Sequence, residues 1–304
     1  MFAIDALNNL LPRLRGQGKK VVAVAAAADA HVLESAARAR ELGIADFALF
    51  GDVGKIKDIC AGLGVDHGLF ELVQADTDAC AASLAVSHVA RGKASAIMKG
   101  LCETSTIIKA ALDKEHGIRA SRRLSHMAMF ALPAEFYHKP LYVTDAAVNI
   151  APDFELMKEI IENAVNAVKS LGLAEPKVAL IAAKEKSDPK MPVTLEFDEL
   201  TKLNEAGWLP GCSVRGPLAL DCAVSLEAAK TKGLDGPVIG DADIIFCPDI
   251  EAGNVLYKSL TMFTKAAAGG VILGAKAPVI LTSRSDSAGN KLLSIALGAL
   301  IKGE

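Results

Sequence analysis

The chain has 304 residues, about twice the length of a typical single domain, so two domains are expected. Apolar residues make up 51% and charged residues 23%, a balance typical of a globular protein with a sizeable core. The net charge of -3 provides no basic field for nucleic acid or an anionic membrane, which excludes those classes of partner.

Short apolar runs alternate with helical patterns along the whole chain. The predicted strands are 20–26, 46–50, 69–74, 94–98, 124–131, 141–144, 177–182, 243–247 and 278–282. The predicted helices are 31–42, 55–63, 76–91, 104–115, 154–171, 197–206, 222–232, 254–268 and 291–301, and the N-terminal spacing suggests one more. Apolar strands joined through helices predict an α/β fold with mainly parallel sheets.

The cysteines and the N-terminal segment indicate the compartment. Six cysteines occur without a CxxC pair, mostly inside apolar or helical runs, which is typical of buried free thiols in a reducing environment. The N-terminus lacks the order of a signal peptide, and no apolar run reaches the roughly 18 residues that a membrane span needs. We therefore expect a cytoplasmic protein.

Polar loops at the ends of predicted strands are the candidate binding sites, because ligands of open parallel sheets bind beyond the carboxyl ends of the strands. The loop 282–290, TSRSDSAGN, offers serine hydroxyls, a guanidinium and the N–H groups of a helix N-terminus. This combination suits phosphate or another oxyanion. The alternative is plain capping of the helix by Ser287, with an exposed Arg284.

A second loop, 98–106 with the sequence MKGLCETST, follows another predicted strand. It predicts a general anion site, although the GxxxxGK[ST] pattern of nucleotide-binding loops is missing. The alternative is a capped helix with a solvated Lys99. Cys102 could be a nucleophile, but no histidine is fixed beside it in sequence, which favours an incidental thiol.

Three further loops have weaker signals. In 248–258, PDIEAGNVLYK, Asn254 and Lys258 lie one helical turn apart, with Asn254 as an N-cap in the alternative interpretation. The loops 214–221 and 144–149 both allow turn-and-cap explanations, with Asp221 as the cap in the first. The six histidines form no metal-ligand spacing, and no GxGxxG follows the first strand. We therefore expect neither a metal site nor a standard dinucleotide site.

Taken in order, these loops resemble the phosphate acetyl/butyryltransferase family. The resemblance rests on MKG…TST, LSHMAMF, VTDAAVNIAPD, GPLALD, PDIEAGNVLYKSL, GAKAPVILTSRSDS and NKLLSIALGAL, and it covers nearly the whole chain. The wording SRSDS, LSHMA and NKLLSIA is more similar to the butyryl-transferring members than to the acetyl-transferring ones. The resemblance implies the reaction acyl-CoA plus phosphate giving acyl phosphate plus CoA, with coenzyme A as a substrate and no cofactor.

The resemblance also implies an architecture and a set of partners. It indicates two three-layer α/β domains of the isocitrate/isopropylmalate dehydrogenase type, 1–145 plus 275–304 and 146–274, with the active site in the cleft between them. The expected partners are acyl-CoA, CoA, phosphate and acyl phosphate. A homo-oligomer, at least a dimer, and a place in butanoate metabolism are expected as well.

Site residues are carried over position by position. Ser283 and Arg284 match family residues implicated in CoA binding and catalysis. Acetyl-transferring members have a proposed general base six positions after that arginine, where this chain has Asn290, so Asp286 is the substitute candidate. The expected substrate-binding residues are Lys99, Gly100, Thr104, Ser105, Ser125, Asp145, Asn149, Asn254, Lys258, Ser285 and Ser287.

Three alternative functions remain open from the sequence. Phosphate acetyltransferase is the nearest, and it differs only in the acyl group. A metal- and NAD-dependent hydroxyacid dehydrogenase of the same fold type would use a different cofactor site from the one that GxGxxG marks. A non-catalytic acyl-CoA-binding protein would need fewer polar loops at strand ends than this chain has.

Overall fold

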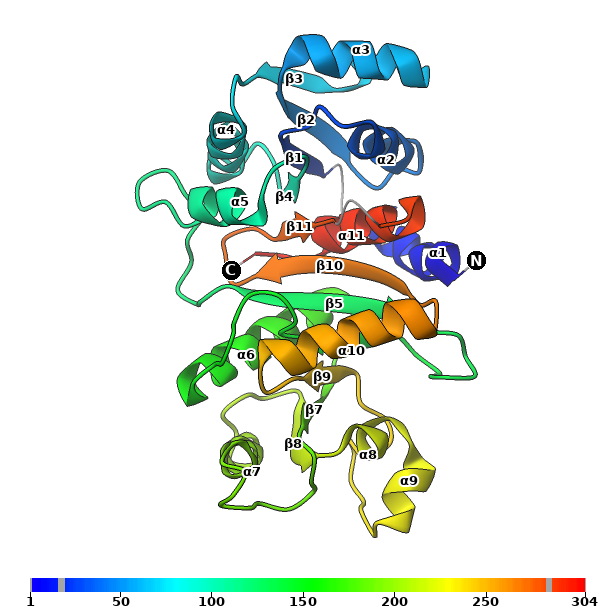
Figure 1. Cartoon of the computed structure of the whole chain (residues 1–304), viewed down its shortest axis with the longest axis vertical. Helices are drawn as coiled ribbons and strands as arrows, with labels where there is room; N and C mark the ends of the chain where they lie inside the picture. Colours follow the sequence, from blue (N-terminus) through cyan, green and yellow to red (C-terminus); the bar gives the residue numbers. More distant parts are fainter. Residues whose placement is uncertain (1, 16–19, 283–285, 304) are drawn as a thin grey trace. The chain divides into compact units, whose positions relative to one another are not determined.

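The computed structural model describes residues 2–15, 20–282 and 286–303, and the chain divides into two compact units (Figure 1). Unit 1 comprises Ala3–Arg122 and Ala268–Glu304, and unit 2 comprises Arg123–Ala267. The sequence placed the boundaries at 145/146 and 274/275 instead. The first boundary lies earlier because the strands 125–131 and 141–144 belong to the hydrogen-bonded sheet of unit 2.

The sheet of unit 1 is parallel except for one strand. Its strands, in spatial order, are β3 (Glu71–Gln74), β2 (Asp46–Gly51), β1 (Val21–Ala25), β4 (Ala96–Lys99), β11 (Val279–Leu281) and β10 (Ala267–Leu273). Only β10 runs antiparallel to its neighbour β11. The central strands β1 and β4 are almost wholly buried and apolar, as is typical of parallel strands covered on both faces.

Helices cover both faces of this sheet. The helices of unit 1 are α1 (Phe2–Arg15), α2 (Ala30–Glu41), α3 (Val53–Leu63), the short 3-10 helix η1 (His67–Leu69), α4 (Asp78–Ala90), α5 (Thr104–Ala111) and α11 (Ala288–Leu300). Helix α4 packs on α5 and β1, whereas α2 packs on α11, on the other side of the strands in Figure 1. β1 and β4 are neighbouring parallel strands, so the loops that lead from their carboxyl ends into α2 and α5 lie next to each other.

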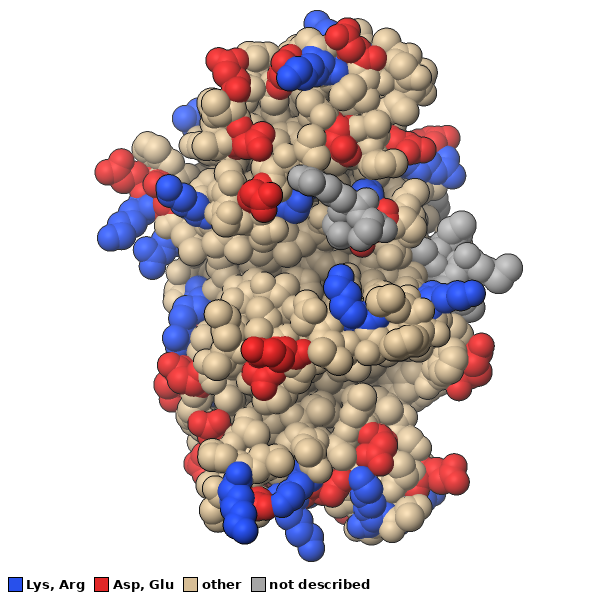
Figure 2. Space-filling model, viewed as in Figure 1, with Lys and Arg blue, Asp and Glu red and all other residues tan. Residues whose placement is uncertain are grey.

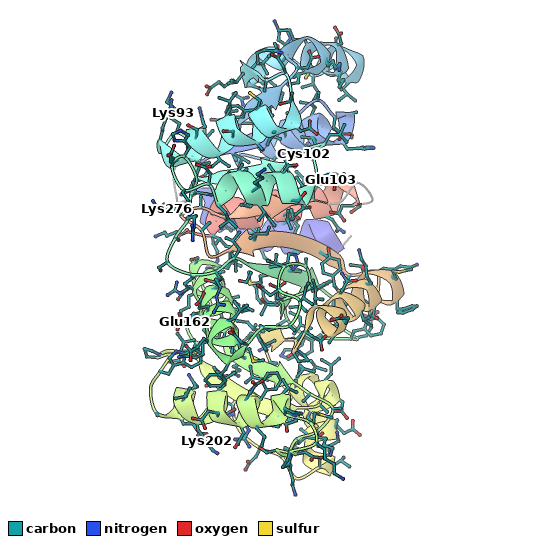
Figure 3. The ribbon with its side chains drawn as sticks, turned by 60° about the vertical axis from the view of Figure 1, so that its left-hand side comes forward. Lys93, Cys102, Glu103, Glu162, Lys202 and Lys276 are labelled. Carbon is teal, nitrogen blue, oxygen red and sulfur yellow. The ribbon has the colours of Figure 1, made fainter. Side chains whose placement is uncertain are left out.

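Unit 2 has the same layered construction. Its strands, in spatial order, are β5 (Ser125–Ala131), β6 (Leu141–Thr144), β9 (Ile244–Phe246), β7 (Lys177–Ile181) and β8 (Ser213–Leu218), with only β5 antiparallel. Its helices are α6 (Phe154–Ser170), α7 (Val193–Glu205), α8 (Leu220–Val224), α9 (Leu226–Thr231) and α10 (Ile250–Phe263). Figures 1 and 3 show α6 and α7 on one face and α10 on the other.

The structure confirms the α/β class and corrects several local predictions. The sequence missed β8, which was read as a Gly-Pro turn; Pro217 is tolerated because β8 is an edge strand of unit 2. It also missed β10, whose AAGG start read as the end of a helix. At Gly269 an added Cβ would lie 2.9 Å from a methyl carbon of Leu297, so glycine lets α11 pack closely on this strand.

The predicted helix 222–232 is two short helices, because Ser225 ends α8 and caps α9 by accepting a hydrogen bond from the Ala228 N–H. The proposed cap roles of Asp221 and Asn254 are wrong. Asp221 lies inside α8, and Asn254 lies inside α10, whose N-cap is Asp249.

An ion-pair network joins the segment before β6 to the segment before β9 in unit 2. The Lys139 ammonium lies 2.8 Å from a carboxylate oxygen of Asp241 and 2.7 Å from one of Asp243, and Lys177 also pairs with Asp241. Partial burial raises the pKa of Asp241, but the hydrogen bonds from the two lysines outweigh it and lower the pKa to about 2. The charged form of Asp241 is therefore favoured in the folded protein.

Acid should remove the stabilisation that the charged Asp241 side chain gives to the folded protein. Because the pKa of Asp241 is lower in the folded protein than the ordinary value of 3.8, the charged carboxylate stabilises the folded state above about pH 4. This stabilisation is lost as the pH falls through the folded pKa of about 2. We expect Asp241→Asn to be less stable than wild type at pH 5, with the difference vanishing toward pH 2 in urea denaturation. The exposed Asp235→Asn is the control. A stability difference that stays constant from pH 5 to 2 would contradict the role given to the network.

Candidate active site

A cavity of about 220 Å³ opens at the carboxyl edge of the unit 1 sheet. It lies where β1, β4 and β11 end, and two of the polar loops singled out from the sequence contribute to its lining. Lys99 and Gly100 come from the loop after β4, and Thr282 begins the loop after β11. The lining residues are Asp29, His31, Val32, Lys99, Gly100, Leu101, Thr282 and Lys291.

Lys99 ends β4 and is half-buried rather than fully solvated. Its ammonium donates to the carbonyl oxygens of Gly100, at 3.1 Å, and Cys102, at 3.2 Å. No described carboxylate forms an ion pair with it. Because an ammonium has three N–H donors, one remains for a ligand.

Gly100 is required by the close approach of two strand ends. A Cβ at this position would lie 2.2 Å from the Ala26 carbonyl oxygen and 2.6 Å from that of Ala25. The N–H groups of Gly100 and Leu101 donate to these same two carbonyls, each at 2.8 Å. The loops after β1 and β4 are thereby tied together, which fixes where the Lys99 side chain begins.

Lys291 is a site residue that sequence reasoning missed. It lies in the first turn of α11 and is only 5% exposed, yet its ammonium has a single hydrogen-bond partner, the Asp286 carbonyl oxygen at 2.6 Å. No described carboxylate pairs with it. In the sequence Lys291 stands between the polar loop and the apolar run 292–301, where a lysine is expected to be exposed, so nothing in the sequence indicated its burial.

The described part of the loop 282–290 has mostly structural contacts. Ser287 is the N-cap of α11 and accepts a hydrogen bond from the Asn290 N–H at 3.2 Å, which confirms the predicted cap. The Asn290 side-chain oxygen accepts from the Ala268 N–H at 3.2 Å, so it holds the start of β10. Asp286 is half-buried. Ser283, Arg284 and Ser285 lie outside the described residues, and their predicted roles stay predictions.

The remaining polar residues of the second loop begin α5. Thr104 and Ser105 lie in its first turn and are not among the described lining residues of the cavity. Cys102 is buried, and burial raises the pKa of its thiol, with Lys99 acting in the opposite direction. A thiol that resists ionisation is a poor nucleophile, which favours the incidental interpretation of Cys102.

The loop after β6 in unit 2 is held by one buried carboxylate. Asp145 accepts hydrogen bonds from the N–H groups of His126, at 3.0 Å, Ala147, at 2.9 Å, and Val148, at 3.0 Å. A fourth comes from the Asn149 amide at 2.7 Å. With four donors satisfied inside the protein, Asp145 acts as the organiser of this turn.

Ser125 and Asn149 belong to the same structural surroundings. Ser125 is fully buried and accepts from the Asn163 amide at 3.0 Å, and Asn149 also donates to the Leu124 carbonyl at 2.9 Å. These contacts account for the polarity of both side chains. Their predicted contacts with substrate stay predictions.

His126 is a buried group of unit 2 that the sequence did not single out. It is 4% exposed, and its Nδ1 has no hydrogen-bond partner. Burial lowers its pKa, against the charge of Asp145, so the ring is favoured in its neutral form. Its ring centroid lies 6.2 Å from that of Tyr257 on α10.

Helix α10 presents the two residues predicted from the loop 248–258. Asn254 is exposed and donates to the Ala146 carbonyl at 3.3 Å, and the exposed Lys258 ammonium lies 5.2 Å from the centre of the Tyr257 ring. Gly253 lets the helix approach the turn, since a Cβ there would lie 2.1 Å from the Asp145 carbonyl oxygen. Asn254 therefore lies beside the Asp145 turn, whereas Lys258 lies one helical turn further along α10.

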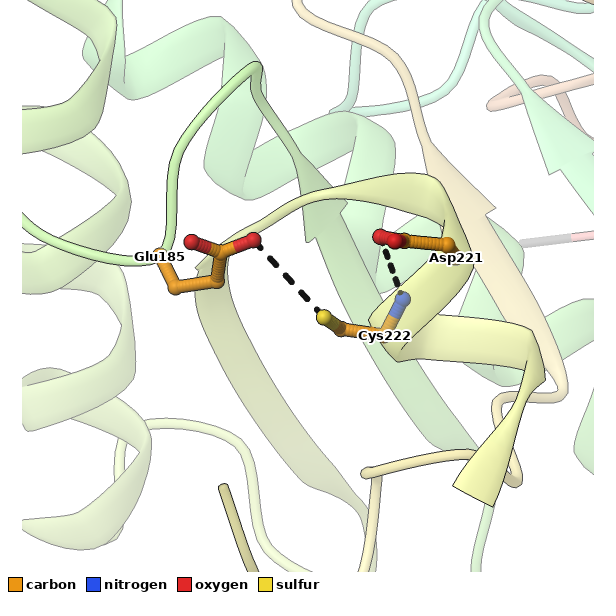
Figure 4. Close-up of side chains that lie close together, drawn as sticks. All are labelled: Glu185, Asp221 and Cys222. Carbon is orange, nitrogen blue, oxygen red and sulfur yellow. Dashed lines mark hydrogen bonds between the residues drawn. The ribbon is translucent and has the colours of Figure 1, made fainter. Parts of the chain in front are cut away.

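One group of potential metal ligands, Glu185, Asp221 and Cys222, occurs among the described residues (Figure 4). The Lys232 ammonium hydrogen-bonds to Glu185 at 2.7 Å and to Asp221 at 3.2 Å. A cation of the protein itself therefore already neutralises these carboxylates, which makes the group an ion-pair cluster. Burial also raises the pKa of the Cys222 thiol, which disfavours the thiolate that would bind a metal.

Surface charge and helix length are the features relevant to nucleic-acid and membrane binding. On the face drawn in Figure 2, the described lysines and arginines are interspersed with aspartates and glutamates. On this face the described charges of the two kinds form no continuous basic stripe. Among the described helices, none is both long and apolar enough to cross a bilayer.

Known proteins resemble this chain over nearly its whole length. Phosphate butyryltransferase of Clostridium acetobutylicum is 43% identical and covers 99% of both chains. Phosphate acetyltransferase of Thermotoga maritima is 40% identical, over 97% of this chain and 99% of its own. The crystal structure of a branched-chain phosphotransacylase from Enterococcus faecalis matches 92% of this chain and 97% of its own, with a TM-score of 0.82 and 39% identity.

A more distant likeness concerns the fold alone. A 4-hydroxythreonine-4-phosphate dehydrogenase from Burkholderia phymatum covers 95% of this chain with a TM-score of 0.58 and 16% identity, which agrees with the expected dehydrogenase-like architecture. The family model described as Phosphate acetyl/butaryl transferase matches residues 79–299. From the fold, the strand-end cavity and these matches together, the chain belongs to the phosphate acetyl/butyryl transferase family of acyltransferases.

Proposed function

We propose that the protein transfers a short acyl group, butyryl in preference to acetyl, between coenzyme A and inorganic phosphate. The observation that carries the proposal is the cavity lined by Lys99 and Lys291, two cations without carboxylate partners. The cavity borders Thr282, and the next two residues in the chain are Ser283 and Arg284. Cations and hydroxyls gathered at strand ends suit a phosphate substrate.

We propose direct transfer within a complex that holds both substrates. A phosphate oxygen attacks the thioester carbonyl carbon, and the C–O bond forms as the carbonyl electrons move onto oxygen. Collapse of this intermediate breaks the C–S bond, and the CoA sulfur leaves with the electron pair as a thiolate that takes a proton. Holding the two substrates together contributes on the order of 7–11 kcal/mol to lowering the barrier.

Each loop residue has a proposed role in this scheme. Arg284 binds a phosphate oxygen pair, and Ser283 donates a hydrogen bond to the oxyanion. In the reverse direction Asp286 accepts the thiol proton. The Asn290 amide is not a base, and its oxygen is already bonded to the Ala268 N–H, which supports Asp286 in place of the family aspartate. A free thiol has a pKa of about 8.5, so this base assists the proton transfer without being indispensable.

Acyl-chain preference is the finer part of the proposal. The relatives include butyryl-, acetyl- and branched-chain-transferring proteins by name, and the SRSDS and LSHMA segments favour butyryl. Acetyl transfer is the second candidate, on the 40% identity to the acetyltransferase.

A thiol-release assay tests this proposal. With butyryl-CoA, free thiol should appear only when phosphate is present, because phosphate is the acyl acceptor. Across acetyl-, butyryl-, isobutyryl- and hexanoyl-CoA, kcat/KM should be highest for butyryl-CoA. Equal thiol release with and without phosphate would contradict acyl transfer to phosphate. A maximum at acetyl-CoA would retain the reaction and reject the butyryl preference.

Several expectations from the sequence stay predictions. We propose a cytoplasmic location, which the absence of a disulfide among the six cysteines supports. We also propose that it needs no cofactor beyond the CoA substrate, forms at least a dimer and acts in butanoate metabolism.

A further inference from the structure

The Lys291 ammonium is a buried cation whose charge has no counter-charge in the described protein. The side chain is 5% exposed, and its single hydrogen bond goes to the neutral carbonyl of Asp286. Burying an unpaired charge is costly unless an anion or further hydrogen bonds compensate it. Residues 283–285, which precede Asp286, include no carboxylate. An anion bound in the cavity would supply the missing counter-charge.

Lys99 provides a second cation for the same space. Its ammonium also bonds only to carbonyl oxygens, and both lysines line the one cavity. Three N–H donors remain between them, two on Lys291 and one on Lys99, because each ammonium has three. Among the described lining residues the one carboxylate is that of Asp29, which is the N-cap of α2 and accepts from the Val32 N–H at 3.0 Å. The balance of charge in the cavity is thus positive.

The size of the cavity limits what this anion is. At about 220 Å³ it lies below the roughly 300–1,000 Å³ of sites for drug-sized ligands, so it suits a small anion rather than a nucleotide. A tetrahedral oxyanion with several acceptor oxygens can bond to both ammoniums at once. The candidates that the proposed reaction supplies are inorganic phosphate, including the phosphoryl group of acyl phosphate, and the terminal 3′-phosphate of CoA.

We infer that the cavity is the subsite for inorganic phosphate and the phosphoryl group of acyl phosphate, with Lys291 and Lys99 as its binding cations. This inference rests on the proposed function and deepens it by assigning Lys291, a position outside the expected site. Lys291 lies seven positions after Arg284, on the helix that begins directly after the loop. The phosphate would thus be bound by a residue that follows, within the same stretch of sequence, the loop residues proposed to act on the acyl group.

The test distinguishes a site for inorganic phosphate from a site for the 3′-phosphate of CoA. In Lys291→Gln and Lys99→Gln, KM for phosphate should rise about tenfold to a hundredfold, the usual effect of losing a charged hydrogen bond. KM for butyryl-CoA should change less than twofold. The ratio of kcat/KM for CoA over 3′-dephospho-CoA in the reverse reaction should stay at its wild-type value. Lys93→Gln is the control, because Lys93 is exposed and lies across unit 1 from Cys102 and Glu103, which follow β4 (Figure 3).

A binding measurement without turnover accompanies the kinetics. Inorganic phosphate alone should raise the Tm of wild type and of Lys93→Gln, and should raise it much less in Lys291→Gln. If Lys291→Gln fails to fold, Lys99→Gln carries the same test.

The outcomes are distinct. Unchanged KM for phosphate in both variants, or a rise in KM for CoA that disappears with 3′-dephospho-CoA, would overturn the inference. Phosphate-independent thiol release by wild type would instead refute the proposed function itself.

Discussion

Arg284→Ala is expected to lower kcat/KM for acyl transfer by about 100- to 1,000-fold while leaving the fold intact. The physical reason is that the guanidinium is proposed to pair with phosphate oxygens as charge develops, and removing one such donor costs roughly 2.7–4 kcal/mol of transition-state stabilisation. Arginine suits this role because its planar fork bonds to two oxygens together. Steady-state kinetics with butyryl-CoA and phosphate, alongside circular dichroism, measures both properties.

Two companion variants interpret the Arg284 result. Arg215→Ala removes an exposed arginine from the edge strand β8 and should keep wild-type turnover. Arg284→Lys retains the charge but not the two-pronged geometry, so it should recover only part of the activity. Near-normal turnover of Arg284→Ala would remove this residue from the mechanism, whatever the family membership.

Asp145→Ala should cause the largest loss of stability, about 3–5 kcal/mol in the free energy of unfolding of unit 2. It would remove one carboxylate and leave four donors without an acceptor, those of His126, Ala147, Val148 and Asn149. Each buried donor left unsatisfied costs about 1–3 kcal/mol, and contributions from one network are not additive. Urea denaturation followed by circular dichroism measures the loss.

The matched control is Asp249→Ala in the same unit. Asp249 also caps a backbone segment, but it accepts one N–H, that of Ala252 at 2.7 Å, so its loss should cost about 1 kcal/mol. A cost for Asp145→Ala no greater than that for Asp249→Ala would show that the buried network does not organise the turn. Asp145 would then be better explained by its predicted contact with substrate.

The sequence was sufficient for the class of fold and for the location of polar loops at strand ends. Continuous apolar strands such as Val21–Ala25 are buried on both faces by helices, so their pattern is visible locally. The prediction of strands failed at β8 and β10, because Pro217 and the two glycines of AAGG interrupt the apolar strand pattern there. Those residues are tolerated because of an edge position and a close helix, which are tertiary facts.

Some features of the candidate site could likewise be predicted from the sequence, and others could not. The residues Lys99, Gly100 and the start of the terminal loop were readable from sequence, because each follows an apolar strand and precedes a helix. Three things required the tertiary structure: the joining of the loops after β1 and β4 at Gly100, the four-bond role of Asp145, and Lys291 as a buried cation. The physical reason is that burial and unpaired charge depend on what packs around a side chain, and neighbours distant in sequence decide that.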